Sequence, residues 1–487
     1  MALLPLILRI WKLLLVLSLL STTYVYLYPL FRGCNFQLSK EGEVASFRLL
    51  AFGDPQLEGD SSLSSSTTSK STEPQGWARF KSIISGKELG TQILSHLHVY
   101  RKRLDLWGND RYLAHIYRTT RWFTSPTHTV VLGDLLGSQW MSDAEFEIRA
   151  QRFWNTTFSG ARPVPDPLFD YEDIAHENSA QWPSTLITVA GNHDIGYAGE
   201  LDSNTAARFE KRFGRLNWDI TFGLENGRLR TLTRNQAAYA EGPRLKLVVL
   251  NTMNLDGPAL DKELQGDTRR FLNNHVGNAM GQTYLDATVV LTHIPLYKKE
   301  AICVDGPLFT HYSTQDGGGI REQNHLTEKS SREILDGLFY YQNTWARSGI
   351  VLNGHDHEGC DVVHTRNLRN ALPEGNVSRI GEWTSLPHEL VHEGGVSRDE
   401  SVREVTLRSM MGAYGGNAGL VSGWFDRKDR RWRFEYRSCM FGVQHIWWAV
   451  HILDLVAGLV GMVVIPLSIW GSASKAHGRS DRAKKNQ

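Results

Sequence analysis

The chain has 487 residues, which is long enough for one large domain with additional segments. Its 53 Lys and Arg residues balance 52 Asp and Glu residues, so the formal net charge is +1. This balance excludes the overall basic surface of many nucleic-acid-binding proteins and the strong acidity of many disordered chains.

Residues 13–31 form an uncharged, mostly apolar run that follows Arg9 and Lys12. Its length is close to the ~20 residues that a helix needs to cross a bilayer. Basic residues before such a run predict that residues 1–12 face the cytosol and that the chain after the run faces a lumen. A cleavable signal peptide is the alternative. The run ends in aromatic residues without a small-x-small cleavage pattern, which favours an uncleaved signal anchor.

Five short apolar runs in the middle of the chain have the pattern of buried strands. Each is followed directly by a block that contains Asp, Asn or His. The blocks are FGDPQ at 52–56, LGD at 132–134, GNHD at 191–194, THIP at 292–295 and GHDH at 354–357. Because α/β folds place their sites at one edge of the sheet, we expect the five blocks to meet there.

These residue types are the ones that a pair of metal ions requires. Two divalent ions roughly 3.5–4 Å apart can clamp the attacking and leaving oxygens of a phosphoryl transfer, and a bridging carboxylate offsets their mutual repulsion. The expected ligands are Asp134 as the bridge, Asp54, Gln56 and His357 on one ion, and Asn192, His293 and His355 on the other. Oxygen and imidazole ligands without thiolate suit Mn, Fe or Zn better than Ca.

Other segments have weaker patterns. Residues 89–123 look helical, and WGND at 107–110 predicts a break that makes them a helical hairpin. Residues 230–251 predict a β-hairpin. Residues 301–319 predict a Gly-rich loop that lines a substrate cleft, and residues 419–436 predict a hairpin that closes the domain.

Residues 446–470 are the second candidate membrane span, with Trp residues at both ends. Asp454 and His451 interrupt this run, and we expect both to lie near the luminal headgroups. The alternative is that Asp454 faces the first membrane helix or a lipid headgroup. The basic tail at 471–487 is expected in the cytosol, so residues 32–445 form a luminal domain between two cytosolic termini.

Three further features fit an oxidising lumen and a membrane protein of the secretory pathway. Asn155 and Asn376 begin N-glycosylation sequons. Lys484 and Lys485 lie fourth and third from the end, which resembles a dilysine retrieval signal, although an ordinary basic membrane flank is the alternative. The four cysteines can pair in three ways, and we expect Cys34–Cys439, beside the two membrane segments, and Cys303–Cys360, after two of the blocks.

The order and spacing of the blocks resemble the calcineurin-like metallophosphoesterases, whose pattern is D-x-H, GD, GNH-D/E, H and GHxH. Gln56 departs from that pattern, because most members have His there. The resemblance implies a four-layer α/β sandwich, with two mixed β-sheets flanked by helices, to which the two transmembrane helices are added. It also implies that His193 is the general acid and that Asp194 or another acceptor polarises it.

With the two membrane segments, the chain resembles the endoplasmic-reticulum membrane metallophosphoesterases that remodel glycosylphosphatidylinositol (GPI) anchors. Fungal members are similar in having DPQ in the first block. The resemblance implies a Mn-dependent phosphodiesterase (Zn or Fe are alternatives) that removes an ethanolamine-phosphate branch from a GPI mannose. Implied partners are the GPI lipid or GPI-anchored proteins, vesicle cargo-receptor machinery and the COPI coat, and no nucleic acid.

Three other functions stay open at this point. The domain could hydrolyse a soluble phosphate ester in the lumen. It could be a non-catalytic cargo or trafficking receptor on the same scaffold, although the intact metal-ligand pattern argues against lost chemistry. It could also sense manganese instead of using it in catalysis.

Overall fold

The computed structural model describes residues 3–59, 87–170, 181–278, 285–341, 345–346, 348–366, 382–391 and 401–485. The chain divides into two compact units. The globular unit comprises residues 34–440, and the helical unit comprises residues 1–33 and 441–487.

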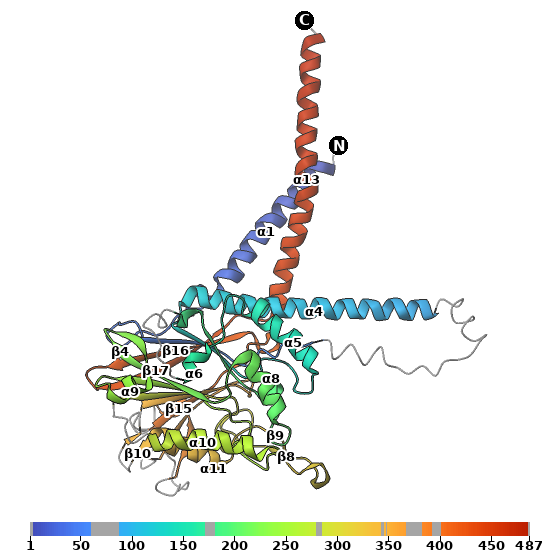
Figure 1. Ribbon diagram of the computed structural model, residues 1–487. Helices are drawn as coiled ribbons and strands as arrows, with labels where there is room; N and C mark the ends of the chain where they lie inside the picture. Colours follow the sequence, from blue (N-terminus) through green and yellow to red (C-terminus); the bar gives the residue numbers. More distant parts are fainter. Residues whose placement is uncertain are drawn as a thin grey trace, which may run out of the picture. The chain divides into compact units, whose positions relative to one another are not determined.

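Two mixed β-sheets form the centre of the globular unit (Figure 1). The five-stranded sheet has the order β17 (Arg431–Met440), β16 (Asn417–Asp426), β1 (Phe47–Phe52), β2 (His128–Leu132) and β3 (Leu186–Val189). The eight-stranded sheet has the order β14 (Thr384–Pro387), β13 (Cys360–Thr365), β15 (Ser401–Thr406), β12 (Ser348–Asn353), β7 (Ala287–Leu291), β6 (Arg244–Val249), β4 (Trp218–Glu225) and β5 (Arg228–Leu232). Neighbouring strands are parallel from β1 to β3 and from β6 through β7 and β12 to β15. Short pairs β8 (Phe309–His311) with β9 (Ile320–Gln323) and β10 (Tyr340–Tyr341) with β11 (Trp345–Ala346) complete the described strands.

The main core lies between the two sheets and is built from alternate residues of their strands. Phe47, Leu49 and Ala51 of β1 belong to it, as do Leu245, Leu247 and Val249 of β6. The intervening residues of β1 point to the opposite face, where Phe52 packs against Tyr117 with ring centroids 6.0 Å apart. This period of two on strands that are apolar on both faces explains why they read as continuous hydrophobic runs.

Helices cover the outer faces of the two sheets, which gives the expected four layers (Figure 1). The longer ones in the globular unit are α4 (Lys87–Thr124), α5 (Asp143–Arg152), α8 (Ser203–Phe213), α10 (Lys262–Asn278) and α11 (Glu328–Phe339). The shorter helical segments are η1 (Phe153–Thr157), α6 (Asp166–Asp170), η3 (Trp182–Ser184), α7 (Asn192–Ile195), α9 (Arg234–Tyr239), η5 (Thr314–Asp316), α12 (His388–Val391) and η7 (Gly412–Tyr414). The α/β fold class predicted from the sequence is therefore confirmed.

The prediction of a helical hairpin over residues 89–123 was wrong, because α4 is one continuous helix. The glycine of WGND costs only about 1 kcal/mol in a helix interior. Its cost is offset because Leu106 and Tyr112 on either side of the motif are buried. Asp110 of the motif is held by Arg152 of α5 at 2.7 Å.

The prediction of a single hairpin over residues 230–251 was also wrong. The hairpin is formed by β4 and β5, and α9 separates β5 from β6. β6 instead lies between β4 and β7. The sequence reading missed β4, whose inward residues Trp218, Ile220 and Phe222 are buried in the core. The hairpin predicted over 419–436 is confirmed as β16 and β17.

Two disulfides join the four cysteines, in the pairing expected from the sequence. Cys34 and Cys439 have Cα atoms 5.6 Å apart, and Cys303 and Cys360 have Cα atoms 5.7 Å apart. Cys439 lies in β17, so the first bond fastens the start of the globular unit to its last strand. Asn155 of the first sequon is exposed in η1, whereas Asn376 lies outside the described residues.

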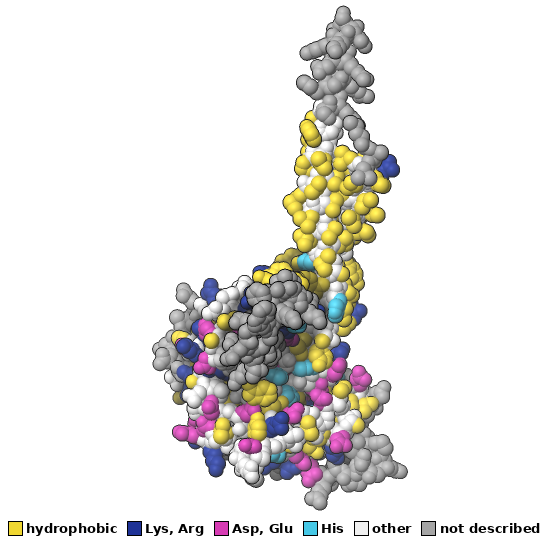
Figure 2. Space-filling view, turned by 90° about the vertical axis from the view of Figure 1, so that its right-hand side faces the viewer, with side chains coloured by type: hydrophobic (Ala, Val, Ile, Leu, Met, Phe, Trp, Pro, Cys, Tyr) yellow, Lys and Arg dark blue, Asp and Glu magenta, His cyan; other side chains and the backbone are white. Residues whose placement is uncertain are grey.

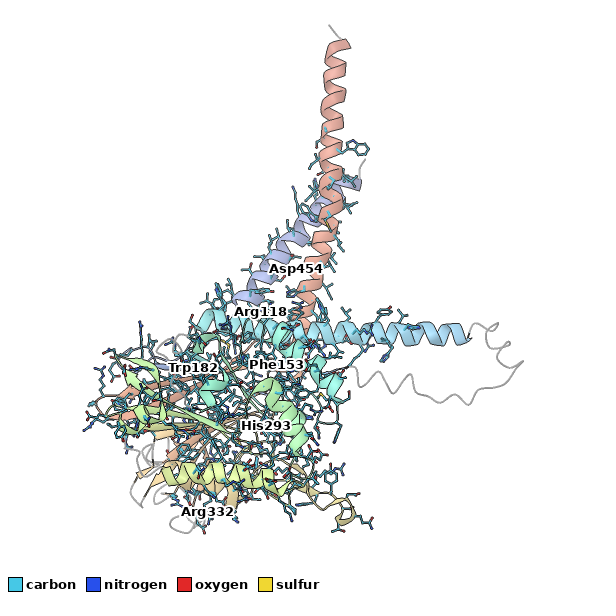
Figure 3. All side chains as sticks on the ribbon, viewed as in Figure 1. Arg118, Phe153, Trp182, His293, Arg332 and Asp454 are labelled. Carbon is cyan, nitrogen blue, oxygen red and sulfur yellow. A yellow bond between two sulfur atoms is a disulfide. The ribbon has the colours of Figure 1, made fainter. Side chains whose placement is uncertain are left out.

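The helical unit consists of α1 (Leu3–Phe31) and α13 (Gln444–Lys485), and each helix contains a stretch long and apolar enough to span a membrane. Figure 2 shows apolar side chains along the described surface of both helices. Asp454 faces α1, the contact given as the alternative to a place near the headgroups. Its carboxylate accepts hydrogen bonds from Ser18 at 2.6 Å and Thr22 at 2.8 Å (Figure 3 labels Asp454). Two hydroxyls of the neighbouring helix satisfy a carboxylate that hydrocarbon would not.

Candidate metal centre

The five blocks follow five strands whose carboxyl ends meet at one edge of the two sheets. Asp54, Asp134 and Asn192 follow β1, β2 and β3 of the five-stranded sheet, and His293 and His355 follow β7 and β12 of the eight-stranded sheet. The expected ligands therefore take their carboxylates and amides from one sheet and their imidazoles from the other, while His193 follows β3.

Two carboxylates and one imidazole form the buried centre of the site. Ligand atoms of Asp54, Asp134 and His293 all lie within 4.8 Å of one another. His293 Nε2 is 3.3 Å from Asp134 Oδ1, and His293 Nδ1 is 2.7 Å from the carbonyl oxygen of Leu132. Figure 3 shows His293 in the interior of the globular unit. The structure thus brings together three side chains that are almost 240 positions apart in the sequence at their extremes.

The other four expected ligands extend this centre on two sides. On one side, Asn192 Oδ1 lies 3.1 Å from His293 Nε2 and 3.0 Å from His355 Nδ1. On the other, Gln56 Nε2 donates to Asp134 Oδ2 at 3.0 Å and lies 3.1 Å from His357 Nε2. All seven expected ligand residues therefore form one connected cluster. They also divide as expected, with Gln56 beside His357, and Asn192 beside His293 and His355.

The donor set fits divalent metal ions. Asp54 Oδ2 is buried without a hydrogen-bond partner among the described residues, although an unpaired carboxylate oxygen is costly away from water. The three histidines, two aspartates and two amides of the cluster bring many hydrogen-bond acceptor atoms together with few donors. A cation would satisfy these acceptors, and for Gln56 this requires the amide to turn so that its oxygen faces the ion.

The glycines of the blocks are required by the close approach of ligands to backbone. A Cβ at Gly191 would lie 2.2 Å from Asp134 Oδ1, and one at Gly133 would lie 2.2 Å from His293 Nδ1. Gly133 also has a φ of 89°, in the left-handed region. Asp54 and Asp134 have positive φ as well, at 49° each. Such backbone is uncommon for residues other than glycine and is concentrated at functional sites.

Burial and neighbouring charges perturb the titration of the central groups. Burial raises the pKa of Asp54 to about 8, with the Asp134 charge adding to the effect. Burial also acts to raise the pKa of Asp134, but attraction to His293 and His193 holds it below its usual range. The pKa of His293 is raised to about 9, because the two carboxylates outweigh the effect of burial.

His193 and Asp194 play different parts in the geometry. The His193 side chain is 34% exposed, and its Nε2 is 3.7 Å from Asp134 Oδ2. Asp194 accepts backbone N–H bonds from Gly191 at 2.9 Å, Leu135 at 3.1 Å and Leu136 at 2.9 Å. The expected polarisation of His193 by Asp194 is therefore not what the structure shows. Asp194 instead ties the loop after β2 to the loop after β3.

A cavity of about 470 Å³ opens over the cluster. It reaches Gln56, Asp134, Asn192, His193, His355 and His357 at its base. Its walls carry both carboxylates and aromatic rings, namely Asp305, Glu322, Asp356, Glu358, Trp140, Tyr197 and Tyr414. Asp305 belongs to the loop predicted to line a cleft, while Glu322 lies just beyond that loop in β9.

A buried ionic network behind the ligands was not found from the sequence. Glu404 of β15 accepts from Lys298 at 3.0 Å, from the backbone of Leu296 at 2.8 Å and from Asn353 at 2.7 Å. Its other oxygen lies 2.6 Å from His364 Nε2. Leu296 follows the His293 block and Asn353 precedes the His355 block, so Glu404 links the two imidazole-bearing loops. The strand reads SVREVT, with Arg403 directly before Glu404, so the sequence carries no signal that this carboxylate is buried.

No family model matches the chain. It is similar to Protein TED1 of Saccharomyces cerevisiae, with 29% identity over 463 residues that cover 85% of this chain and 82% of that protein. An uncharacterized protein of Schizosaccharomyces pombe is 26% identical over 470 residues, covering 93% of this chain and 95% of that protein. Metallophosphoesterase 1 of Mus musculus is 25% identical over 340 residues, covering 65% of this chain and 71% of that protein.

Proposed function

Because the chain belongs to the metallophosphoesterase superfamily and has relatives of the fungal TED1 kind, we propose that it is a metal-dependent phosphodiesterase. Its proposed reaction removes an ethanolamine-phosphate branch from a mannose of the GPI-anchor glycan. The observation that carries the proposal is the connected cluster of seven candidate ligand residues beneath an open cavity.

The ligand set supports manganese as the metal. Carboxylates and carboxamides favour hard cations, while three imidazoles favour transition metals over Ca. Asp134 is the proposed bridge, since it contacts His293 on one side and Gln56 on the other. Metal ions bound there would lower the pKa of an attacking water and neutralise charge on the phosphate oxygens.

His193 is the proposed general acid. It is the imidazole of the site that reaches the cavity without belonging to the ligand set, and its backbone N–H donates to Asp134 at 2.9 Å. That bond fixes the start of α7 beside the bridge, so the ring is held near the reacting phosphate. There the imidazolium can protonate the leaving sugar oxygen. Asp194 contributes by positioning the loop and takes no part in the proton transfer.

The cavity walls support a phosphodiester with a cationic group. An ammonium is bound by a carboxylate or by the face of an aromatic ring. Asp305 and Glu322 supply carboxylates, and Tyr197 and Tyr414 supply aromatic rings. The ethanolamine amine has the charge that these carboxylates match, and Arg321 of the same cavity can face the phosphate.

The location and partners follow from the membrane segments as part of the proposal. We place the globular unit in the lumen of the endoplasmic reticulum and both termini in the cytosol. Membrane attachment confines the enzyme and a lipid-anchored substrate to one plane, which raises their effective concentration. The substrates are then the GPI lipid or GPI-anchored proteins, and Lys484 and Lys485 are the contact for the COPI coat. Removal of the branch would permit capture by cargo-receptor machinery.

The decisive experiment is mass spectrometry of GPI glycans from cells that lack the protein. The cells are rescued with wild type, Asp134→Ala, His193→Ala, or the surface variant Asp267→Ala as the matched control. We expect ethanolamine-phosphate to be retained on one mannose and corrected only by wild type and the control. Unchanged glycans in the unrescued cells would reject GPI remodelling in favour of a soluble ester. Full rescue by both site variants would reject catalysis in favour of a receptor.

A further inference from the structure

Helix α4 carries an apolar stripe on the face turned away from the rest of the globular unit. Leu97, Tyr100, Leu104 and Trp107 are 58%, 66%, 55% and 52% exposed. Their spacing of three, four and three places all four on one face of the helix. Single exposed apolar residues are ordinary, but four large ones in a row form a surface that water covers poorly.

Contacts on the opposite face fix the orientation of the stripe. Leu106, Tyr112 and Ile116 are buried. Lys102 reaches Glu58, just beyond the first ligand block, at 2.6 Å. Because these residues hold α4 against the unit, the helix cannot rotate to bury the stripe in the unit's own core. Among the described residues none buries the stripe, whose four side chains stay more than half exposed.

We propose that this face of α4 lies in the headgroup region of a lipid bilayer, an inference that rests on the proposed membrane attachment. Leu, Tyr and Trp on one face with flanking cations are the composition of helices that lie in a membrane interface. Arg101 and Arg103 flank the stripe on its two sides, and Arg111 continues its line. Long basic side chains of this kind reach lipid phosphates while their stems stay on apolar surface.

The chain enters and leaves the globular unit at the edge on which α4 packs. Only Arg32 and Gly33 separate α1 from Cys34, and three residues separate β17 from α13. Met440, the last residue of β17, pairs with Asn417 at the start of β16. The preceding Gly416 packs so closely on α4 that a Cβ there would lie 2.2 Å from Tyr112 Oη. Helix α4 therefore packs on the edge at which the chain enters and leaves the globular unit.

The test is site-specific photo-crosslinking of the full chain in nanodiscs of phosphatidylcholine and phosphatidylserine. A benzophenone amino acid replaces Leu104 in the stripe, Leu459 in α13 as the positive control, or Tyr239 as the matched control. Tyr239 is an aromatic residue of α9 that is 85% exposed on the globular unit. Lipid adducts are counted by mass spectrometry.

We expect lipid adducts at Leu104 comparable to those at Leu459 and several-fold above those at Tyr239. Adducts at Leu459 with none at Leu104 would overturn the interfacial helix and leave membrane attachment intact. A protein adduct at Leu104, to a second copy or to another segment of the chain, would overturn it in favour of a protein contact. Absence of lipid at both positions would overturn the membrane attachment and the inference with it.

Discussion

Strand β2 buries an ionisable side chain at each of its two ends, and the two ends differ in what surrounds that side chain. At its amino end, His128 is enclosed by the rings of Phe47, Trp182 and Phe222, with centroids 5.0–5.2 Å away. At its carboxyl end, Asp134 is enclosed by polar groups from Gln56, His193 and His293. Both side chains are at most 3% exposed.

The comparison shows that burial of an ionisable group does not by itself mark a functional site. Burial lowers the pKa of His128 to about 3, so the ring stays neutral and acts as part of the core. Asp134 keeps its charge because partners from several strands converge on it. What distinguishes the end with the candidate site is the convergence of polar side chains from separate loops.

Replacing Asp134 by Asn should have the largest effect, because it removes the charge on which the cluster converges. Loss of an outer-shell partner typically costs about 10–100-fold, so loss of the proposed bridge should cost at least about 10³-fold. Hydrolysis of bis(p-nitrophenyl) phosphate and the bound metal content are measured together. Asp267→Asn on the surface is the control. Full activity of Asp134→Asn would place the reaction elsewhere.

The variant Glu404→Gln tests whether a buried charged group can be structural and still support the site. It leaves the Lys298 ammonium fully buried without its carboxylate, and breaking such a pair costs about 3–5 kcal/mol. Thermal unfolding of the full chain in detergent measures the loss. The double variant Lys298→Met/Glu404→Gln should recover part of it, because no unpaired charge is left. Equal stability of Glu404→Gln and wild type would contradict a charged pair.

The variant His128→Phe breaks the proton linkage at the amino end of β2. The folded-state pKa of about 3 lies below the unfolded value of 6.5. The unfolded chain therefore binds a proton that the folded chain does not, and this contribution to stability is complete above pH 6.5 and lost as the pH falls. At pH 5 this lowers the free energy of unfolding by about 2 kcal/mol.

Urea unfolding at pH 7 and pH 5 should show a smaller acid loss for His128→Phe than for wild type. His311→Phe, at an exposed histidine of β8, is the control and should keep the wild-type loss. An unchanged acid dependence of His128→Phe would mean that the ring accepts a proton in the folded state.

Substitutions of Gln56 should have the smallest effect. They test whether this residue contributes to metal binding beside Asp134, at the carboxyl end of β2. An amide oxygen is a weaker ligand than imidazole, so Gln56→Ala should weaken Mn²⁺ binding about tenfold, and Gln56→His should strengthen it. Competition with a chelator measures both affinities. Gln139→Ala is the control, since Gln139 lines the same cavity but donates to Glu200 at 3.4 Å. Equal affinity in all variants would exclude Gln56 from the ligand set.

The local sequence pattern was sufficient to predict the five strands that precede the candidate ligands, because each is an apolar run that ends abruptly in polar residues. It failed for α4, where tertiary burial of Leu106 and Tyr112 overrode the local signal of Gly108. We also missed β4, although Trp218, Ile220 and Phe222 alternate with other residues as in a half-buried strand and both of its partner strands, β5 and β6, follow it in the chain. Asp454 shows the same limit as α4, since its partners Ser18 and Thr22 lie on a helix more than 430 positions away.

The sequence by itself determined the candidate ligands, the strand that precedes each of them and the two apolar helices, because these depend on residue type and short-range period. Only the tertiary structure decided which groups touch. It joined Gln56 to Asp134 and His357, assigned Asp194 to the backbone instead of to His193, and placed Glu404 between two ligand loops. The reason is physical. Side-chain contacts between strands far apart in the chain depend on how the two sheets pack and on the path of the backbone after each strand, neither of which has a local signature.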